Sequence, residues 1–98
     1  MRNNNILVIG RVTFDLGLSK SPDGTDIYRF EVAVTDPGEN PQKFTFHCIG
    51  PIAITASKVA KVGKSVTVHG HCKFSDFAQW VFFADSVGLN MLHHIDNQ

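Results

Sequence analysis

The chain has 98 residues, of which 43% are hydrophobic and 18% are charged, and nine Asp and Glu balance nine Lys and Arg. This composition excludes a disordered chain, and the longest apolar run, Ile6–Ile9, is far shorter than the ~20 residues of a membrane-spanning helix. The start, MRNNN, has no apolar segment typical of a signal peptide. Two cysteines, Cys48 and Cys72, are too few for a disulfide framework. We therefore expect one cytoplasmic domain with buried free thiols.

The first predicted element is a strand over Ile6–Phe14. Its unbroken apolar run, Ile6–Ile9, predicts a segment buried on both faces, and the alternation of Val12 and Phe14 with polar neighbours predicts a half-buried segment after it. Gly10 stands where the pattern changes, and glycine inside a strand often marks a bend or a bulge. We expect the strand to bend at Gly10 and to pair with different neighbours on either side, as in a small closed barrel.

Two more strands follow. Ser21–Gly24 has proline and glycine at the positions that a type I turn favours. The next segment, Ile27–Val34, alternates apolar and polar residues, which predicts a half-buried strand. A loop rich in proline and glycine, Asp36–Pro41, leads to a third alternating segment, Lys43–Ile49.

One helix is predicted after the third strand. Pro51 suits a first helical position, apolar residues recur at helical spacing from Ile52 to Val62, and Gly63 is suited to a cap just past the helix end.

Two strands complete the domain: Ser65–Phe74, in which Gly70 predicts a bend or bulge, and Trp80–Val87. Five strands with one helix between the third and the fourth is the order of the OB-fold. We therefore predict an all-β, five-stranded Greek-key OB barrel over residues 1–92, followed by a polar tail over 93–98.

Histidine and cysteine cluster in His69, His71 and Cys72, with His47 and Cys48 earlier in the chain. Alternation along a strand places His69 and His71 on one face and Cys72 on the other, so four zinc ligands would not converge. The sequence also lacks paired carboxylates, a nucleophile motif and a glycine-rich phosphate loop. We predict no metal, no cofactor and no enzymatic activity.

Several stretches resemble the bacterial single-stranded DNA-binding protein (SSB) family. Asn5–Thr13 resembles the opening strand of that family, an apolar run followed by Gly-Arg-Leu-Thr, and Asp15–Val34 is similar to its D-x-x-L-x-x-x-P-x-G…F-x-L-A-V. The spacing from Gly50 to Gly63 and Gly70 and the ending Ala84-Asp85-Ser86-Val87 also match. The resemblance covers about residues 5–92. It implies an OB-fold that binds single-stranded DNA in replication, recombination or repair and forms a homo-oligomer.

The chain also departs from the family. Positions that carry base-stacking aromatics on the third strand of SSB proteins fall on Lys43 and Ile49, whereas the hairpin aromatic is kept near Phe77 in a shortened hairpin. The acidic tail with its aromatic tip, which recruits replication and repair proteins in the family, has no counterpart at residues 95–98. A short, tail-less domain of this kind resembles primosomal accessory proteins of the PriB type, or versions of the fold from mobile elements. The resemblance implies a dimer if the protein is PriB-like and a tetramer if it is SSB-like.

An OB groove binds single strands by contacting phosphates with cations and stacking bases on aromatic rings. We predict that the nucleic-acid-binding residues are Arg11, Lys20, Arg29, Lys43, Thr45, His47, Lys73, Phe77 and Trp80. Half-exposed strands carry such polar residues without any ligand, so each position also has a purely structural interpretation. The remaining phenylalanines of the strands are expected in the core, namely Phe30, Phe44, Phe46, Phe82 and Phe83.

A protein-interaction module with weak or no DNA binding is the alternative. The zero net charge and the missing strand-three aromatics favour it, because most nucleic-acid binders carry a basic excess. Stacking and phosphate contacts also bind RNA, so RNA is an alternative ligand. Ile6–Ile9, apolar on both faces, predicts a subunit contact.

Overall fold

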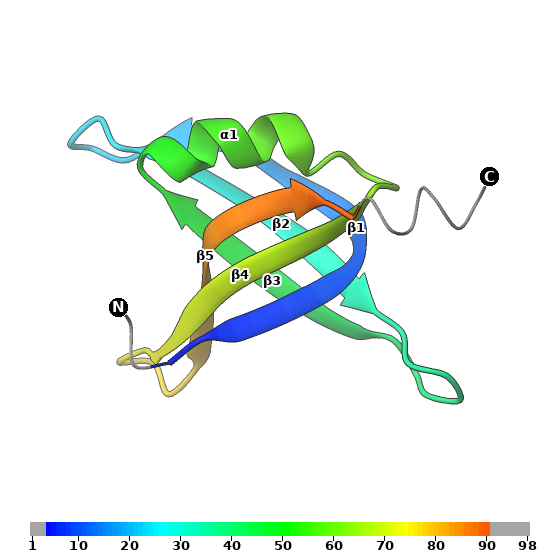
Figure 1. Ribbon diagram of the computed structural model, residues 1–98. Coiled ribbons are helices and arrows are strands. Elements are labelled where there is room, and N and C mark those ends of the chain that lie inside the picture. Colours follow the sequence, from blue (N-terminus) through cyan, green and yellow to red (C-terminus); the bar gives the residue numbers. More distant parts are fainter. Residues whose placement is uncertain (1–3, 91–98) are drawn as a thin grey trace.

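The computed structural model describes residues 4–90 and contains one closed barrel, so the predicted tail at 93–98 lies outside the described residues. Its elements, in chain order, are β1 (Ile6–Lys20), β2 (Asp26–Val34), β3 (Gln42–Ile49), α1 (Pro51–Val59), β4 (Ser65–Phe74) and β5 (Trp80–Leu89). Around the barrel the strands are ordered β1-β2-β3-β5-β4, and α1 lies across one end (Figure 1). The predicted OB architecture is confirmed.

Strand β1 joins both halves of the barrel by changing partners at Gly10 and Arg11. Before this point it pairs with β4, from Ile6 opposite Gly70 to Arg11 opposite Ser65, and after it with β2. A Cβ atom on Gly10 would lie 2.4 Å from the carbonyl oxygen of Ala33, so only glycine allows the two strands to approach this closely. The predicted bend is confirmed, and β1 continues to Lys20, beyond its predicted end.

Two irregularities after the bend change which side chains of β1 face the solvent. The pairing with β2 shifts between Val12 and Phe14, and again between Asp15 and Gly17. In a bulge two residues oppose one, so the strict alternation does not continue and Phe14, opposite Glu31, is 55% exposed instead of buried.

In the first half of β1, only one face of the strand is covered by other residues of the chain. Val8 is buried, whereas Leu7 and Ile9 are 57% and 50% exposed. The expectation that Ile6–Ile9 is buried on both faces is therefore wrong for the single chain, because only the inner face packs against the core and nothing in residues 4–90 covers Leu7 and Ile9 on the outer face.

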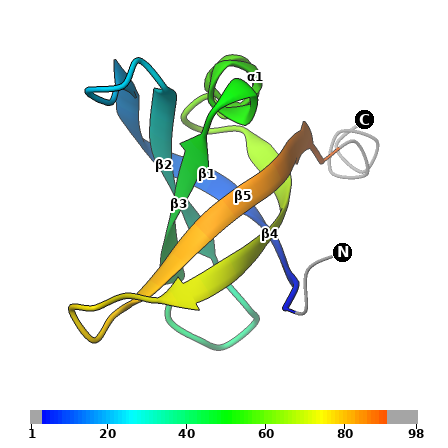
Figure 2. The same ribbon diagram turned by 90° about the vertical axis from the view of Figure 1, so that its left-hand side faces the viewer.

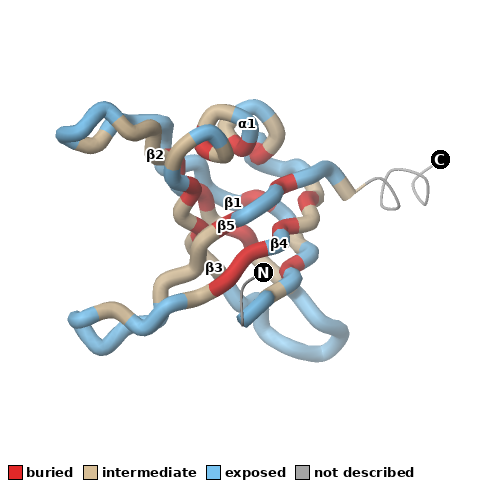
Figure 3. The backbone as a smooth tube through the Cα atoms, turned by 60° about the vertical axis from the view of Figure 1, so that its left-hand side comes forward, coloured by how far each residue is buried: buried red, intermediate tan, exposed pale blue. Residues whose placement is uncertain are grey.

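Buried residues lie along every strand of the barrel (Figure 3) and form one core, in which the rings of Phe30 and Phe46 are stacked 5.8 Å apart. Helix α1 closes one end with small buried side chains, Ala53 and Ala56. The Tyr28 hydroxyl donates to the carbonyl oxygen of Ala60 at 3.2 Å, which ties β2 to the end of the helix. Tyr28 is buried, and this burial raises the pKa of its hydroxyl.

The two thiols are unpaired, and Cys48 is the fully buried one, while Cys72 is half-buried. Burial raises the pKa of the Cys48 thiol to about 12, so it stays protonated at neutral pH.

Helix α1 ends earlier than predicted. Ala60 is its C-cap, and the N–H of Ala60 donates to the carbonyl oxygen of Ala56 at 2.8 Å. Gly63 lies in the following turn at φ +91°, where its N–H donates to the carbonyl oxygen of Val12 at 2.8 Å. Gly63 thus links the turn after α1 to β1 by a hydrogen bond, and it does not cap the helix. Val62, assigned to the helix by its spacing, is 61% exposed.

Within residues 4–90, no helix has the length and apolar character to cross a membrane.

We expect Gly10→Ala and Gly70→Ala each to lower the free energy of unfolding by at least ~1–3 kcal/mol, the range for overpacking. An added Cβ would lie 2.4 Å from the Ala33 oxygen in one case and 2.0 Å from the Phe83 oxygen in the other. Urea denaturation at one protein concentration measures the change.

Gly88→Ala is the matched control, because a Cβ on this glycine of β5 meets nothing within 4 Å. It should leave the stability unchanged or slightly raised. Equal unfolding midpoints for all three variants would contradict the close-approach argument.

Candidate nucleic-acid interface

Two hairpins frame one outer face of the barrel. The β1–β2 and β4–β5 hairpins extend past the barrel on the same side, with β2, β3 and β5 between them (Figure 2). The first hairpin turns at Ser21–Gly24, as predicted, where the N–H of Gly24 donates to the carbonyl oxygen of Ser21 at 2.9 Å. The Asp23 carboxylate accepts from the hydroxyl of Ser21 and from the N–H of Thr25, and these bonds lower its pKa to about 2. This turn is therefore internally fixed at neutral pH.

A row of side chains crosses this face from strand to strand. Arg29 of β2 is opposite His47 of β3, His47 is opposite Phe83 of β5, and Phe83 is opposite His71 of β4. Directly opposed residues of neighbouring strands point to the same side of a sheet. The barrel thus places a guanidinium, an imidazole, a phenyl ring and a second imidazole side by side, although they are far apart in the sequence.

Phe83 lies on the outer face, contrary to the expectation that it belongs to the core. Its neighbour Phe82 takes the inward position and packs edge-on against Phe44 at 5.5 Å between ring centroids. Side chains alternate along a strand, so the residue after Phe82 must point outward. Phe83 is half-buried there, with its ring 6.0 Å from that of His47.

His71 supports the Phe83 ring from the side of β4. The two rings are stacked, with centroids 5.2 Å apart and planes at 15°, and His71 is only 5% exposed. Its Nδ1 lies 2.9 Å from Oδ2 of Asp85. Since an ionised carboxylate only accepts hydrogen bonds, Nδ1 carries the proton in this contact.

The charged groups of this face are partly paired. Oε1 of Glu31 accepts from the Thr13 hydroxyl at 2.8 Å and lies 4.0 Å from Nζ of Lys43. Nζ of Lys73 lies 5.6 Å from the centroid of the Phe83 ring, within the range of a cation–π contact. Thr45, opposite Glu31, is half-buried. The two strand carboxylates of the face, Glu31 and Asp85, therefore both have close partners.

His47 is held in its neutral form more strongly than an exposed histidine. Burial lowers its pKa, and the positive charge of the neighbouring Arg29 lowers it further. At pH 7 His47 thus acts as a polar, uncharged side chain between the Arg29 guanidinium and the Phe83 ring.

The β4–β5 hairpin separates the two predicted stacking aromatics. Phe77, at its tip, is 87% exposed and lines a hollow together with Lys73 and Val81. Trp80 pairs with Phe74 next to the Lys73–Val81 pair, and their rings meet edge-on at 5.2 Å. Because successive pairs point to opposite faces, Trp80 is directed to the reverse side of the hairpin.

Two predicted cations lie apart from the row. A guanidinium nitrogen of Arg11 donates to the carbonyl oxygen of Gly63 at 2.5 Å, in the connection between α1 and β4. Nζ of Lys20, near the tip of the first hairpin, forms an ion pair with Asp26 at 2.8 Å. The structure therefore brings together Arg29, Lys43, Thr45, His47, Lys73 and Phe77 along one side of the barrel and places Arg11, Lys20 and Trp80 at its margins.

Two adjoining hollows follow β4 and β5 on this face. One is lined by His47, Ile49, Ile52, His71, Lys73, Phe83, Ala84 and Asp85, and the other by Lys73, Phe74, Ser75, Asp76, Phe77, Val81 and Phe83. They share Lys73 and Phe83, so they adjoin one another between the middle of the barrel and the hairpin tip.

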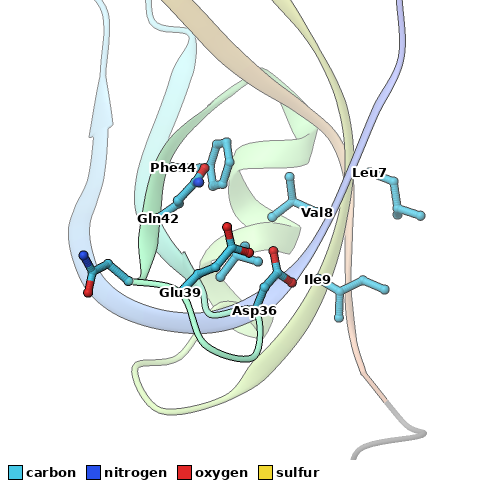
Figure 4. A pocket seen from close by; sticks show the side chains of 9 residues that line it. Leu7, Val8, Ile9, Asp36, Glu39, Gln42 and Phe44 are labelled. Carbon is cyan, nitrogen blue, oxygen red and sulfur yellow. The ribbon is translucent and has the colours of Figure 1, made fainter.

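A third hollow, at the end of the barrel away from α1, has a different character. Its floor is apolar, with Val8 and Phe44, and Figure 4 shows the carboxylates of Asp36 and Glu39 at its mouth. Carboxylates repel phosphates, so this hollow does not suit a nucleic-acid backbone. No three His, Cys, Asp or Glu side chains within residues 4–90 come close enough to hold a metal ion.

Sequence reasoning missed the outward direction of Phe83 and Phe14, and it did not include His71 in the site. For Phe82 and Phe83 a signal exists, because adjacent strand residues cannot both face the core. Which of the two points outward depends on the pairing of β5 with β3 and β4. For Phe14 no such signal exists, since a bulge with β2 determines its direction.

Comparisons with known proteins agree with this geometry. The family model described as the single-strand binding protein family matches residues 3–80. A second single-stranded DNA binding protein (SSBb) from Mycobacterium smegmatis superposes with a TM-score of 0.78 at 24% identity, over 92% of this chain and 91% of its own. No curated protein matches the sequence significantly.

Two further solved structures have the same fold. The SSB domain of a Synechococcus sp. protein has a TM-score of 0.77 at 15% identity, covering 90% of this chain and 97% of its own. The protein priB from Ralstonia solanacearum has a TM-score of 0.75 at 13% identity, covering 91% and 100%. At these identities the likeness concerns the fold.

We expect NMR titration to give His47 a pKa below its ordinary 6.5, because burial and Arg29 both disfavour the charged ring. The unfolded chain then takes up this proton first as the pH falls. The contribution of His47 to stability is therefore complete above pH 6.5 and is lost as the pH falls through the lowered pKa.

Arg29→Gln should raise the His47 pKa only part of the way to 6.5, since burial is the larger cause. Lys43→Gln, on the same strand as His47, is the control and should leave it unchanged. A His47 pKa at or above 6.5 in the unmodified protein would refute this account of the site.

Proposed function

This chain belongs to the single-strand binding protein family, and from that premise we propose that it binds single-stranded DNA, without sequence preference, across the outer face between its two hairpins. The observation that carries this is the row in which Arg29, His47 and Phe83 lie directly opposite one another on β2, β3 and β5. A cationic track beside aromatic rings is how OB-folds hold single strands. Its role is non-catalytic, in DNA replication, recombination or repair, and its place of action is the cytoplasm.

In the proposed mechanism, polar side chains contact the DNA backbone and an aromatic ring contacts a base. Arg29, Lys43 and Lys73 contact phosphates, Thr45 and His47 donate hydrogen bonds, and Phe77 stacks on a base. Arg11, Lys20 and Trp80, at the margins of this face, contact only a strand long enough to continue around the barrel or the hairpins. RNA offers the same phosphates and bases, so it is a second ligand of the same face.

The zero net charge of the chain does not oppose this proposal, because the local arrangement of charges decides binding. Nζ of Lys43 lies 4.0 Å from Glu31 and offsets part of the repulsion that this carboxylate exerts on a phosphate, and Asp85 is hydrogen-bonded to His71. Neutrality overall predicts modest long-range attraction and a contact-based affinity that salt weakens.

A second candidate function is a module for protein contacts in a primosome-type assembly. The hollow with an apolar floor and the carboxylates of Asp36 and Glu39 at its mouth favours it, since this chemistry suits a basic peptide better than DNA. The two functions use different surfaces, and a DNA titration separates them. Replication and repair proteins are the partner class that either function implies.

We also propose that the protein is a homo-oligomer, a dimer or a tetramer, through the outer face of β1. Leu7 and Ile9 are 57% and 50% exposed on one face of the strand and form an apolar surface that an isolated barrel would leave in water. A second copy can cover this surface with its own Leu7 and Ile9, as in an isologous interface.

Fluorescence anisotropy with a labelled oligo-dT should show saturable binding that weakens with salt. Log K should fall with log salt by ~0.7 per phosphate contact, so three cations predict a slope of about −2. Lys73→Gln should reduce that slope by ~0.7. Absence of binding at low salt would refute the proposal and favour the protein-contact function.

Phe77→Ala should weaken this binding by ~1–3 kcal/mol, the contribution of one stacked base. Trp80→Ala is the matched control, because it removes an aromatic ring from the reverse side of the same hairpin. A larger loss for Trp80→Ala than for Phe77→Ala would show that the strand follows the other side.

Leu7→Lys should lower the mass measured by light scattering, because it places a charge in the apolar contact of β1. Val62→Lys is the control, since Val62 is equally exposed, at 61%, but lies in the connection after α1. An unchanged mass for Leu7→Lys, or a monomeric unmodified protein, would exclude this interface.

A further inference from the structure

Phe83 has a central position among the aromatic side chains of the outer face. It lines both hollows of the outer face, and the residue that shares this property is Lys73. One hollow continues towards Asp85 and Ile49, and the other towards Phe77 at the hairpin tip. Phe83 and Lys73 thus form the divide between two adjoining depressions.

The Phe83 ring is fixed before any ligand arrives. His71 stacks on it at 5.2 Å and is itself 95% covered, and Asp85 holds the imidazole through the 2.9 Å contact with Nδ1. Exposed phenyl rings usually move between rotamers, and binding then costs the entropy of ordering them. Here packing has already ordered the ring, so less of the contact energy is lost when a ligand binds.

The groups around Phe83 fit the chemistry of a nucleotide. The hollow nearer the barrel centre holds about 260 Å³, several times the ~30 Å³ share of one water molecule. Its walls are the flat rings of Phe83 and His47, and cations lie close by, with Lys73 over the Phe83 ring and Arg29 beside His47. Flat rings suit the faces of a base, and cations at the divide suit the phosphate that links two bases.

We propose that Phe83 is a base-stacking residue and that the two hollows it divides take successive bases of a single strand. Lys73, which lies 5.6 Å from the Phe83 ring centroid in the free protein, moves from the ring to the phosphate between those bases. His71 and Asp85 are positioning residues, because they act through the ring and not on the ligand. This inference rests on the proposed function and adds to it a central stacking site.

Anisotropy titration of oligo-dT tests the inference with two substitutions at one position. Phe83→Leu keeps an apolar side chain but removes the flat ring, and should weaken binding by at least about fivefold, the lower end for one stacked base. Phe83→Tyr keeps the ring and should bind within about twofold of the unmodified protein. Leucine and tyrosine variants that bind equally well, or that lose affinity equally, would overturn the stacking role.

Photocrosslinking of the unmodified protein gives a second readout that does not depend on the folding of a variant. An oligo-dT with a single 5-iodo-deoxyuridine is irradiated in the complex, and the crosslinked residue is found by mass spectrometry. Crosslinks at both Phe83 and Phe77 support successive bases on either side of the divide. Crosslinks at Phe77 without any at Phe83 would refute the central site while leaving DNA binding intact, whereas no binding by the unmodified protein would remove both proposals.

Discussion

Barrel closure in this protein depends on two glycines that admit a neighbouring backbone where a side chain would otherwise stand. Gly10 lets β1 approach β2 at the carbonyl of Ala33, and Gly70 lets β4 approach β5 at the carbonyl of Phe83. Gly10 lies where β1 passes from β4 to β2, and Gly70 lies where the pairing of β4 with β5 shifts by one residue. A side chain at either position would push the two strands apart and weaken the pairings that close the barrel.

Closure also creates the outer face that carries the proposed function. The insertion of β5 between β3 and β4 rests on a short parallel pairing, in which Phe46 is opposite Phe82 and His47 is opposite Phe83. The first pair seals the core, and the second forms the middle of the outer row. Stability and ligand contact thus depend on the same backbone register, so a slip of β5 by one residue would exchange Phe82 with Phe83 and impair both.

The net charge of the chain is zero, and it does not predict how charges are arranged on the outer face. Two carboxylates on the strands of this face have close partners, Glu31 with Thr13 and Lys43, and Asp85 with His71. Asp36 and Glu39 lie away from this face, at the mouth of the hollow at the far end of the barrel, whereas Asp76 lines the hollow near the hairpin tip. Family membership is thus compatible with zero net charge, because the proposed function relies on the local arrangement of charges and rings.

The sequence by itself determined the order of the elements, the turn at Ser21–Gly24, the bend at Gly10 and the inward positions of Phe30 and Phe46, because each is a local property of one segment. Alternation, turn chemistry and glycine placement act within a few residues. The polar site candidates on β2 and β3 followed from the same alternation.

The tertiary structure alone decided the exposure of Phe14, the outward position of Phe83, the burial of His71 and the end of the helix before Gly63. Each of these depends on a partner strand that lies far away in the sequence: β2 creates the bulge that turns Phe14 outward, β3 fixes the side of Phe83, and β1 accepts the hydrogen bond from Gly63. Residue patterns describe what one strand prefers, but register and bulges are set between strands, where the fit of two backbones selects the face that each side chain takes.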